Sequence, residues 1–93
     1  MDGTKPFGLV EYVVGQLRLT PKQRQITLML ATGHDSKSIM ERLCIRPGTL
    51  RTHKRSIFSK LDVHSQVELV ARIHAKALEL ATQLPSTALA SLS

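Results

Sequence analysis

Signals that start and stop helices alternate along residues 20–81, and no strand-like alternation of apolar and polar residues interrupts them. In the first signal, Thr20 caps a helix, Pro21 suits its first turn and Gln23 completes a capping box. Gly33 ends this helix, because glycine accepts the left-handed backbone conformation. We therefore predict an all-α fold.

Three further helices follow from signals of the same kind. Asp35 caps a short helix over Ser36 to Leu43. Pro47 begins a third helix, because proline cannot continue a helix but can start one. A second capping box at residues 65–68 starts a fourth helix, which should run to about Ala81.

Apolar residues at helical spacing predict the side of each helix that faces the core. In the first two helices these are Ile26, Met29 and Leu30, then Ile39, Met40 and Leu43. In the third they are Leu50, Ile57, Phe58 and Leu61, with His53 or Lys54 filling the turn between. In the fourth they are Val67, Val70, Ile73, His74 and Ala77.

The chain divides into three parts. Residues 19–81 form a four-helix, bundle-like domain. Residues 1–18 are a linker or an additional N-terminal helix, since the stretch from Phe7 to Leu17 is apolar. Residues 82–93, rich in Ser, Ala and Thr, are expected to be a flexible tail.

The charge balance narrows the choice of partner. A net charge of +6 favours polyanions, either nucleic acid or an anionic membrane. The apolar run from Ile26 to Ala31 is far too short to span a bilayer, so we expect no membrane partner. The single cysteine, Cys44, excludes an internal disulfide and suits a cytoplasmic protein. Between Leu43 and Ile45, it is predicted to be buried.

The basic residues concentrate in one window. No acid occurs between Glu41 and Asp62. Arg51 and Arg55 lie one helical turn apart, where both could enter a major groove, and each could donate two hydrogen bonds to a guanine. Thr52 adds a hydroxyl and a methyl that could meet a thymine. The basic residues of the window are Arg42, Arg46, Arg51, Lys54, Arg55 and Lys60.

A short helix, a tight turn and a longer basic helix make the helix-turn-helix layout, here at about residues 36–55. The prediction is that residues 47–61 form a recognition helix that reads double-stranded DNA in the major groove. Two interpretations compete with it: a merely solvated basic face, or a module that uses its basic helix or its fourth helix to bind a protein partner or an acidic surface.

The chain also resembles a known family, the LuxR-type (GerE-like) helix-turn-helix domain, over residues 19 to about 73. The resemblance implies a four-helix bacterial transcription regulator whose third helix reads DNA and whose fourth helix contributes to a two-fold homodimer. The matching residues are Leu19-Thr20-Pro21-Lys22-Gln23-Arg24-Gln25, Gly33, Lys37, Ile39, Leu43, Ile45, Thr49-Leu50-Arg51-Thr52-His53 and Lys60-Leu61-Asp62-Val63.

The same resemblance assigns roles by position. Arg51, Thr52 and Arg55 match the base-facing sites. Lys37, Arg46, Thr49, His53, Lys54 and Lys60 are the candidates for DNA-backbone contacts or for support of the recognition helix. The candidate dimer residues are Glu68, Leu69, Arg72, Ile73 and Lys76.

Two positions depart from the family pattern. Gln25 stands where the family usually has Glu, so a buried or helix-bridging carboxylate is missing. Arg46 replaces the usual Ser or Thr cap of the recognition helix, which costs about 1 kcal/mol of capping. Its charge also suits a helix N-terminus poorly unless a DNA phosphate lies there, which makes Arg46 a candidate phosphate ligand.

Catalysis finds no support in the sequence. The four histidines, His34, His53, His64 and His74, are scattered without metal-ligand spacing, so we expect no metal and no cofactor. No nucleophile elbow or glycine-rich phosphate loop occurs. The alternative within DNA binding is a sigma-factor-like promoter-reading domain, for which RNA polymerase would be a further partner. His53 and the Lys60–Val63 exit favour the LuxR-type interpretation.

Overall fold

The computed structural model describes residues 7–83, and every regular element in that range is an α-helix. The predicted all-α class, with an additional N-terminal helix, is confirmed. Residues 82 and 83, which were predicted to start the tail, are the last two residues of the final helix. The rest of the predicted tail, from residue 84, lies outside the described residues. The helices are α1 (Phe7–Gln16), α2 (Pro21–Ala31), α3 (Ser36–Leu43), α4 (Pro47–Leu61) and α5 (Gln66–Gln83).

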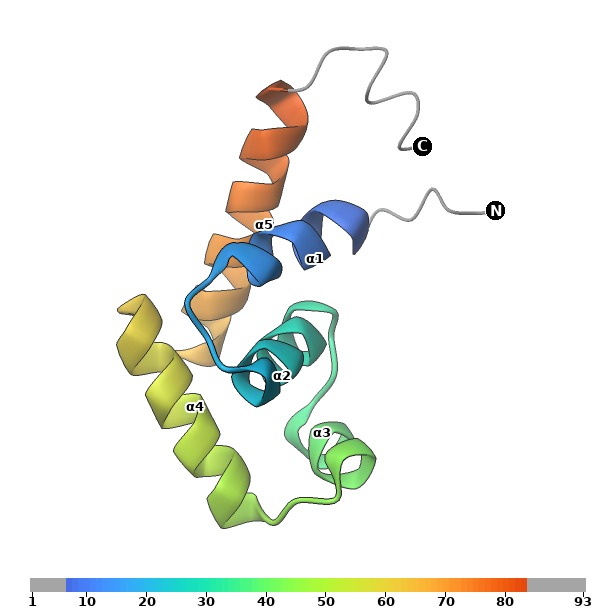
Figure 1. The fold of residues 1–93 in the computed structure, drawn as a ribbon, viewed down its shortest axis with the longest axis vertical. Helices are drawn as coiled ribbons and strands as arrows, with labels where there is room; N and C mark the ends of the chain where they lie inside the picture. The colour runs from blue at the N-terminus through green and yellow to red at the C-terminus, as the bar shows by residue number, and fades with distance from the viewer. Residues whose placement is uncertain (1–6, 84–93) are drawn as a thin grey trace.

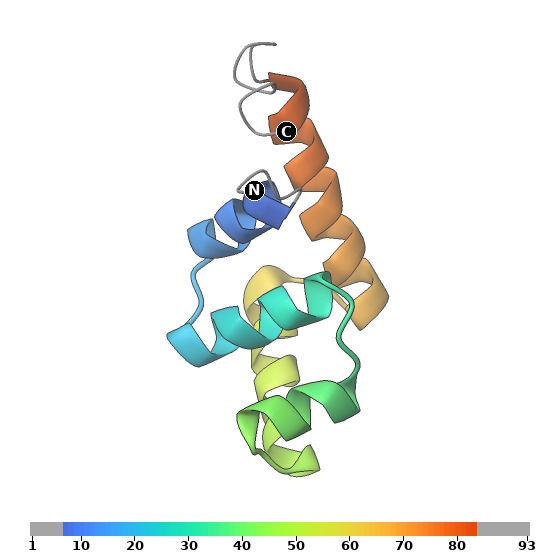
Figure 2. The same cartoon turned by 90° about the vertical axis from the view of Figure 1, so that its right-hand side faces the viewer.

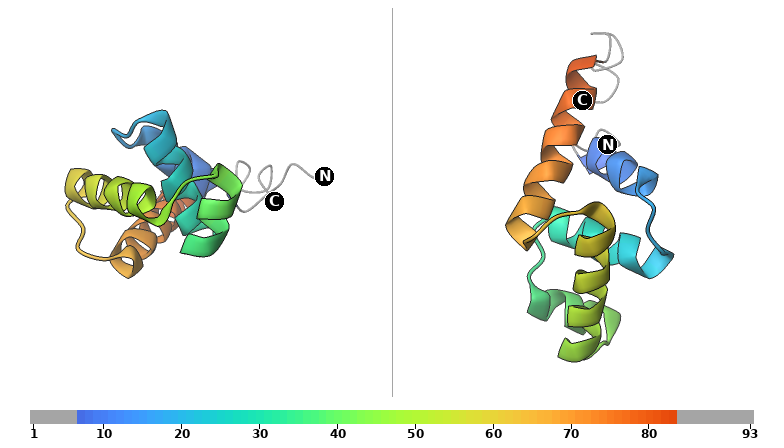
Figure 3. Two further views of the ribbon diagram at one scale, coloured as in Figure 1. Left: turned by 90° about the horizontal axis from the view of Figure 1, so that it is seen from below. Right: turned by 90° about the vertical axis from the view of Figure 1, so that its left-hand side faces the viewer.

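The five helices pack around one core, with α3 and α4 at the end opposite the C-terminal half of α5 (Figure 1). The helix α1 crosses α5, and α2 lies between this pair and the pair formed by α3 and α4 (Figure 2). Seen from below, α4 forms one edge of the molecule (Figure 3). One side of α4 therefore faces the rest of the chain and the other side faces outward.

The core takes one almost inaccessible apolar side chain from each helix. Val14, Ile26, Ile39, Ile57 and Leu69 are each less than 2% exposed. Burying an aliphatic side chain of this size stabilises the fold by roughly 1.5–3 kcal/mol. Because α3 contributes only one fully buried residue, Ile39, it is the most lightly anchored helix of the five.

The predicted helix starts are confirmed by their caps. The Gln23 N–H donates to Thr20 Oγ1 and the Thr20 N–H donates to Gln23 Oε1, each at 3.2 Å, which closes the capping box of α2. Asp35 caps α3, since its Oδ1 accepts from the Ser38 N–H at 2.8 Å. Pro47 opens α4 as expected.

The helix ends depend on left-handed residues. Gly33 has φ +97° just after α2, as predicted for the residue that ends this helix. Cys44 ends α3 with φ 55° and Asp62 ends α4 with φ 54°. The prediction that Cys44 is buried was wrong: the left-handed turn at this residue directs its side chain outward, and Cys44 is exposed.

The box at the start of α5 is shifted by one residue from the predicted pattern. The Glu68 N–H donates to Ser65 Oγ at 3.1 Å, as expected. Glu68 Oε1 accepts from the His64 N–H at 2.8 Å, one residue before the predicted donor. Glu68 therefore still stabilises the beginning of α5.

The predicted buried face of α5 was partly wrong. Val67 is 79% exposed and His74 is exposed as well. Ile73 and Ala77 are buried as predicted, and Leu69, which was not predicted, continues the same side of the helix at a spacing of four. The helix α5 packs against α1, α2 and α4, and these contacts decide which of its sides is buried.

The helix α1 belongs to the same core as the rest of the chain. Val10, Val13 and Val14 are all buried, and α1 packs against both α5 and α2. The guanidinium of Arg24 secures the link between α1 and α2, because its Nη2 donates to the carbonyls of Leu17 and Leu19 at 3.3 and 3.2 Å. The hydrophobic core therefore includes residues on both sides of position 18.

Candidate nucleic-acid interface

The helices α3 and α4 and the turn between them form a helix-turn-helix. Cys44 supplies the left-handed turn, and the Ile45 N–H donates back to the Met40 carbonyl at 3.1 Å. Pro47 then starts α4 at once. The short connection joins the two helices at an angle, with α4 on the outer edge of the molecule (Figure 3).

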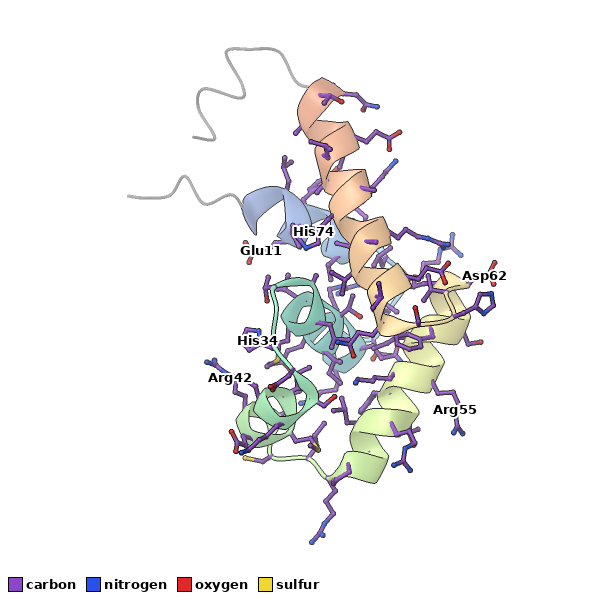
Figure 4. All side chains as sticks on the ribbon, turned by 180° about the vertical axis from the view of Figure 1, so that it is seen from behind. Glu11, His34, Arg42, Arg55, Asp62 and His74 are labelled. Atoms are coloured by element: carbon purple, nitrogen blue, oxygen red, sulfur yellow. The ribbon has the colours of Figure 1, made fainter. Side chains whose placement is uncertain are left out.

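The two sides of α4 differ sharply in burial. Leu50 and Ile57 are 3% and 0% exposed and face the core. The opposite side, which we name the exposed face of α4, consists of the exposed residues Arg51, Thr52, Arg55 and Ser59. For Arg51, Thr52 and Arg55 this exposure is what the sequence predicted. Figure 4 shows the Arg55 side chain pointing away from the body of the molecule.

The arginines on this face are available to a ligand. Within residues 7–83, the side chains of Arg51 and Arg55 form no hydrogen bond and no ion pair. The Thr52 hydroxyl donates to the Gly48 carbonyl at 3.0 Å, so its oxygen can still accept a hydrogen bond while its methyl remains free for an apolar contact. Planar guanidinium groups on a protruding helix have the shape and charge to contact base edges.

The other predicted contact residues fall into two groups. Lys37, Arg46 and Thr49 are exposed, and His53 is half-buried beside the core side of α4. Arg46 occupies the N-cap position of α4 and makes no side-chain cap hydrogen bond, as its side chain has no acceptor. The first amide groups of α4 therefore lack a side-chain partner at this cap.

Lys54 and Lys60 form the second group, because both ammonium groups bond to other helices. Lys54 Nζ donates to Ser36 Oγ at 2.7 Å and to Gln66 Oε1 at 3.1 Å. Ser36 is the first residue of α3 and Gln66 is the first residue of α5. Lys54 thus connects three helices, and it fills the turn between Leu50 and Ile57, as the sequence predicted for this position or for His53.

Lys60 connects α4 to α2. Its Nζ donates to Gln23 Oε1 at 2.8 Å, and Gln23 Nε2 donates to Ser56 Oγ at 2.9 Å. The bridging group between these helices is therefore the buried amide of Gln23. Gln25, which stands where the family usually has a glutamate, is exposed.

Two of the predicted dimer residues lie in the core of the chain itself. Leu69 is 1% and Ile73 is 3% exposed, so neither can contact a second copy. Glu68 pairs with Arg72 at 2.9 Å and Lys76 pairs with Glu79 at 2.9 Å along the surface of α5. A different set of α5 side chains is apolar and exposed, namely Val67, Ala71, Ala75 and Leu78.

Two histidines, His34 just after α2 and His74 on α5, form hydrogen bonds with carbonyl groups at the C-terminal end of α2. His34 Nδ1 lies 3.1 Å from the Met29 carbonyl, and His74 Nε2 lies 2.7 Å from the Ala31 carbonyl. A carbonyl can only accept, so each ring nitrogen donates.

Over residues 7–83, no three His, Cys, Asp or Glu side chains gather where they could hold a metal ion. In the same range, no helix combines the length and apolar character that crossing a membrane requires.

Sequence reasoning missed three polar residues at the helix junctions. Gln23 was predicted only as part of a cap, and Ser36 and Gln66 were given no role beyond their helix starts. Their contacts join positions 12 to 37 residues apart, so no local pattern signals them. Because capping already accounts for a polar residue at the start of a helix, the sequence gives no reason to expect a second, long-range contact from it.

The fold and the protruding basic helix define a helix-turn-helix protein, and comparison with known proteins gives its family. The family model "Bacterial regulatory proteins, luxR family" (GerE) matches residues 17–73. The chain belongs to this family of helix-turn-helix, DNA-binding transcription regulators. No solved structure matches the chain significantly.

Several curated proteins are similar over the same region. The chain is 43% identical to the response regulator GacA of Pseudomonas aeruginosa over 51 residues, covering 55% of the chain and 24% of that protein. It is 43% identical to the monoamine regulon transcriptional regulator of Klebsiella aerogenes over 54 residues, covering 58% and 24%. It is 44% identical to the Fimbriae Z protein of Salmonella typhimurium over 59 residues, covering 61% and 27%. The chain therefore spans about a quarter of the length of these relatives.

Proposed function

We propose that this chain reads specific sequences in double-stranded DNA by laying α4 in the major groove, as part of a bacterial transcription regulator. The observation that carries the proposal is the exposed face of α4, where Arg51 and Arg55 lie one turn apart and point outward. The core side of the same helix is completely buried at Ile57, so α4 presents this face on a rigid support.

The base contacts come from three residues. Arg51 and Arg55 each donate to a guanine, where a two-bond contact discriminates against a wrong base by roughly 1–3 kcal/mol. Thr52 lies between them in sequence, and its methyl meets a thymine. Because Arg51 and Arg55 are four residues apart, they address neighbouring base pairs.

The phosphate contacts come from residues around this face. Lys37 on α3 and Arg46 at the start of α4 are exposed cations on either side of the turn, and Thr49 adds a hydroxyl. These contacts supply affinity that does not depend on sequence and that falls with salt. His53, half-buried, supports α4 from behind.

The regulator binds DNA as a two-fold homodimer through α5. The spacing of Val67, Ala71 and Leu78 places them on one face of α5, opposite the buried Leu69 and Ile73. Val67 and Leu78 are 79% and 67% exposed, so a second copy that covers them would remove this apolar surface from water. Two copies that share this face would present their α4 helices to successive half-sites.

A gel-shift series tests the DNA-reading proposal. Duplexes are first selected from a random pool with the parent protein, and binding is then measured to a selected duplex and to a random one. Arg51→Ala and Arg55→Ala should lose preference for the selected duplex, whereas Lys37→Ala should weaken binding to both. If all three variants bind both duplexes as the parent does, the assignment of α4 fails.

A further inference from the structure

The six basic residues between Glu41 and Asp62 do not all face the same way, and Lys54 is the clearest exception. Its side chain is half-buried, whereas Arg46, Arg51 and Arg55 are exposed. Two of its three N–H donors are used within the molecule, by Ser36 on α3 and Gln66 on α5. Its ammonium is therefore committed to the junction of three helices.

The junction lies beside an opening between α3 and α4. A depression of about 230 Å³ separates the two helices, lined by Ser36, Met40, Pro47, Leu50, Arg51 and Lys54. Ile39 is the only fully buried side chain of α3. Since apolar packing leaves this space open, the hydrogen bond from Lys54 to Ser36 is the direct polar link across it.

We propose that Lys54 is a positioning residue, which sets the angle between α3 and α4 and so determines sequence specificity without touching DNA. The inference rests on the proposed function, in which Lys37 on α3 holds a phosphate while Arg51 and Arg55 on α4 meet bases. Both sets of contacts form together only at one angle between the helices. Lys54 fixes that angle from the inner side of α4, with Gln66 fixing Lys54 in turn.

The position of Lys54 also predicts that its loss leaves the fold intact. Ser36 and Gln66 begin α3 and α5, and the N-termini of helices carry partial positive charge. An ammonium at this place is opposed by both helix dipoles, and its two hydrogen bonds offset that cost. A neutral side chain of similar length, as in Lys54→Met, should therefore fold with little loss of stability.

The salt dependence of binding separates a positioning residue from a phosphate ligand. On the duplex selected by the parent, Lys54→Met should bind roughly tenfold more weakly, about the value of one hydrogen bond to a charged group. Its affinity for random duplex and the slope of log affinity against log salt should match those of a charge control on α2, Lys22→Met. Lys37→Met should lower that slope by about 0.9, the value for one phosphate contact. A slope that falls equally in Lys54→Met would overturn the proposal.

A double-mutant cycle tests the route through Gln66. Gln66→Ala removes the second acceptor of the Lys54 ammonium without changing any charge. If Lys54 acts by position, the losses of selected-duplex affinity in Lys54→Met and Gln66→Ala should not add in the double variant. Additive losses would show that Lys54 acts independently of Gln66 and would contradict the proposal.

Amide hydrogen exchange of the free protein tests the role of Lys54 independently of DNA binding. In Lys54→Met the amides of α3, including that of Ile39, should exchange faster, and those of α2 should be unchanged. If the parent selects no duplex, the proposed function fails while the exchange result still decides the role of Lys54. Unchanged exchange in α3 would reject the positioning role whatever the DNA result.

Discussion

Gln23 and Lys60 are joined by a hydrogen bond of 2.8 Å between Oε1 and Nζ, although 37 positions separate them in the chain. The same Gln23 amide donates to Ser56 on α4 and closes the cap of α2 at Thr20. One buried side chain thus starts α2 and holds α4 against it. The exposed face of α4 depends on this junction, because the opposite side of the helix must stay fixed.

Replacing Gln23 with alanine should cost stability. The variant loses half of the capping box and leaves Ser56 and Lys60 without their partner, a loss of about 1–3 kcal/mol. Urea unfolding measures the difference. Gln25→Ala, an exposed change on the same helix, should remain within about 0.5 kcal/mol of the parent. Equal effects of the two changes would show that the amide bridge does not stabilise the fold.

Replacing Arg46 should stabilise α4 and weaken the proposed contact with DNA phosphate. As the N-cap of α4 it makes no cap hydrogen bond, so Arg46→Ser should raise the free energy of unfolding by about 0.5–1 kcal/mol. The same change should lower the salt dependence of DNA binding, because one proposed phosphate contact is lost. Thermal unfolding and salt-titrated binding measure the two effects. Arg42→Ser, in the last turn of α3, should not be stabilising.

The two faces of α5 should respond differently to substitution. Leu78→Glu, on the exposed side, should leave stability nearly unchanged and abolish the proposed homodimer on DNA. Leu69→Ala, on the buried side, should cost about 2–5 kcal/mol of stability. Analytical ultracentrifugation of protein–DNA complexes gives the stoichiometry, and urea unfolding gives the stability. A Leu78→Glu protein that still binds as two copies would contradict the assigned face.

Alanine substitutions at Gly33 and Gly48 should show whether backbone conformation, rather than steric crowding, determines the effect on stability. A Cβ at either position meets nothing within 4 Å, so crowding does not distinguish them. Gly33 has φ +97°, and Gly33→Ala should destabilise the fold by about 1–2 kcal/mol. Gly48 lies in the first turn of α4, where Gly48→Ala should stabilise by up to about 1 kcal/mol. Changes of the same sign would contradict this explanation.

The helix boundaries were predictable because they are set locally. Thr20 and Asp35 each accept a hydrogen bond from the amide three residues further on. Pro47 starts α4 through its own fixed φ, and Gly33 ends α2 by its own backbone conformation. The outward direction of Arg51 and Arg55 followed from the apolar spacing of Leu50 and Ile57. For these residues, the local sequence is enough to determine the conformation and the direction of the side chain.

The errors lie where distant contacts decide. The apolar residues of α5 cover more than one of its sides, so periodicity could not choose between Val67 and Leu69, and packing against α1, α2 and α4 made the choice. Cys44 has apolar neighbours in sequence, but the left-handed turn between two helices exposes it. The roles of Lys54 and Gln23 depend on partners brought together only by the tertiary fold.

The central claim is that Arg51 and Arg55 touch guanines from the major groove, and methylation interference tests it most directly. Dimethyl sulfate methylates guanine N7, which lies in that groove. On a selected duplex, methylation of particular guanines should block the parent protein, and Arg55→Ala should become insensitive at one guanine while staying sensitive at the others. A parent protein that is indifferent to N7 methylation, or an Arg55→Ala pattern identical to that of the parent, would contradict it.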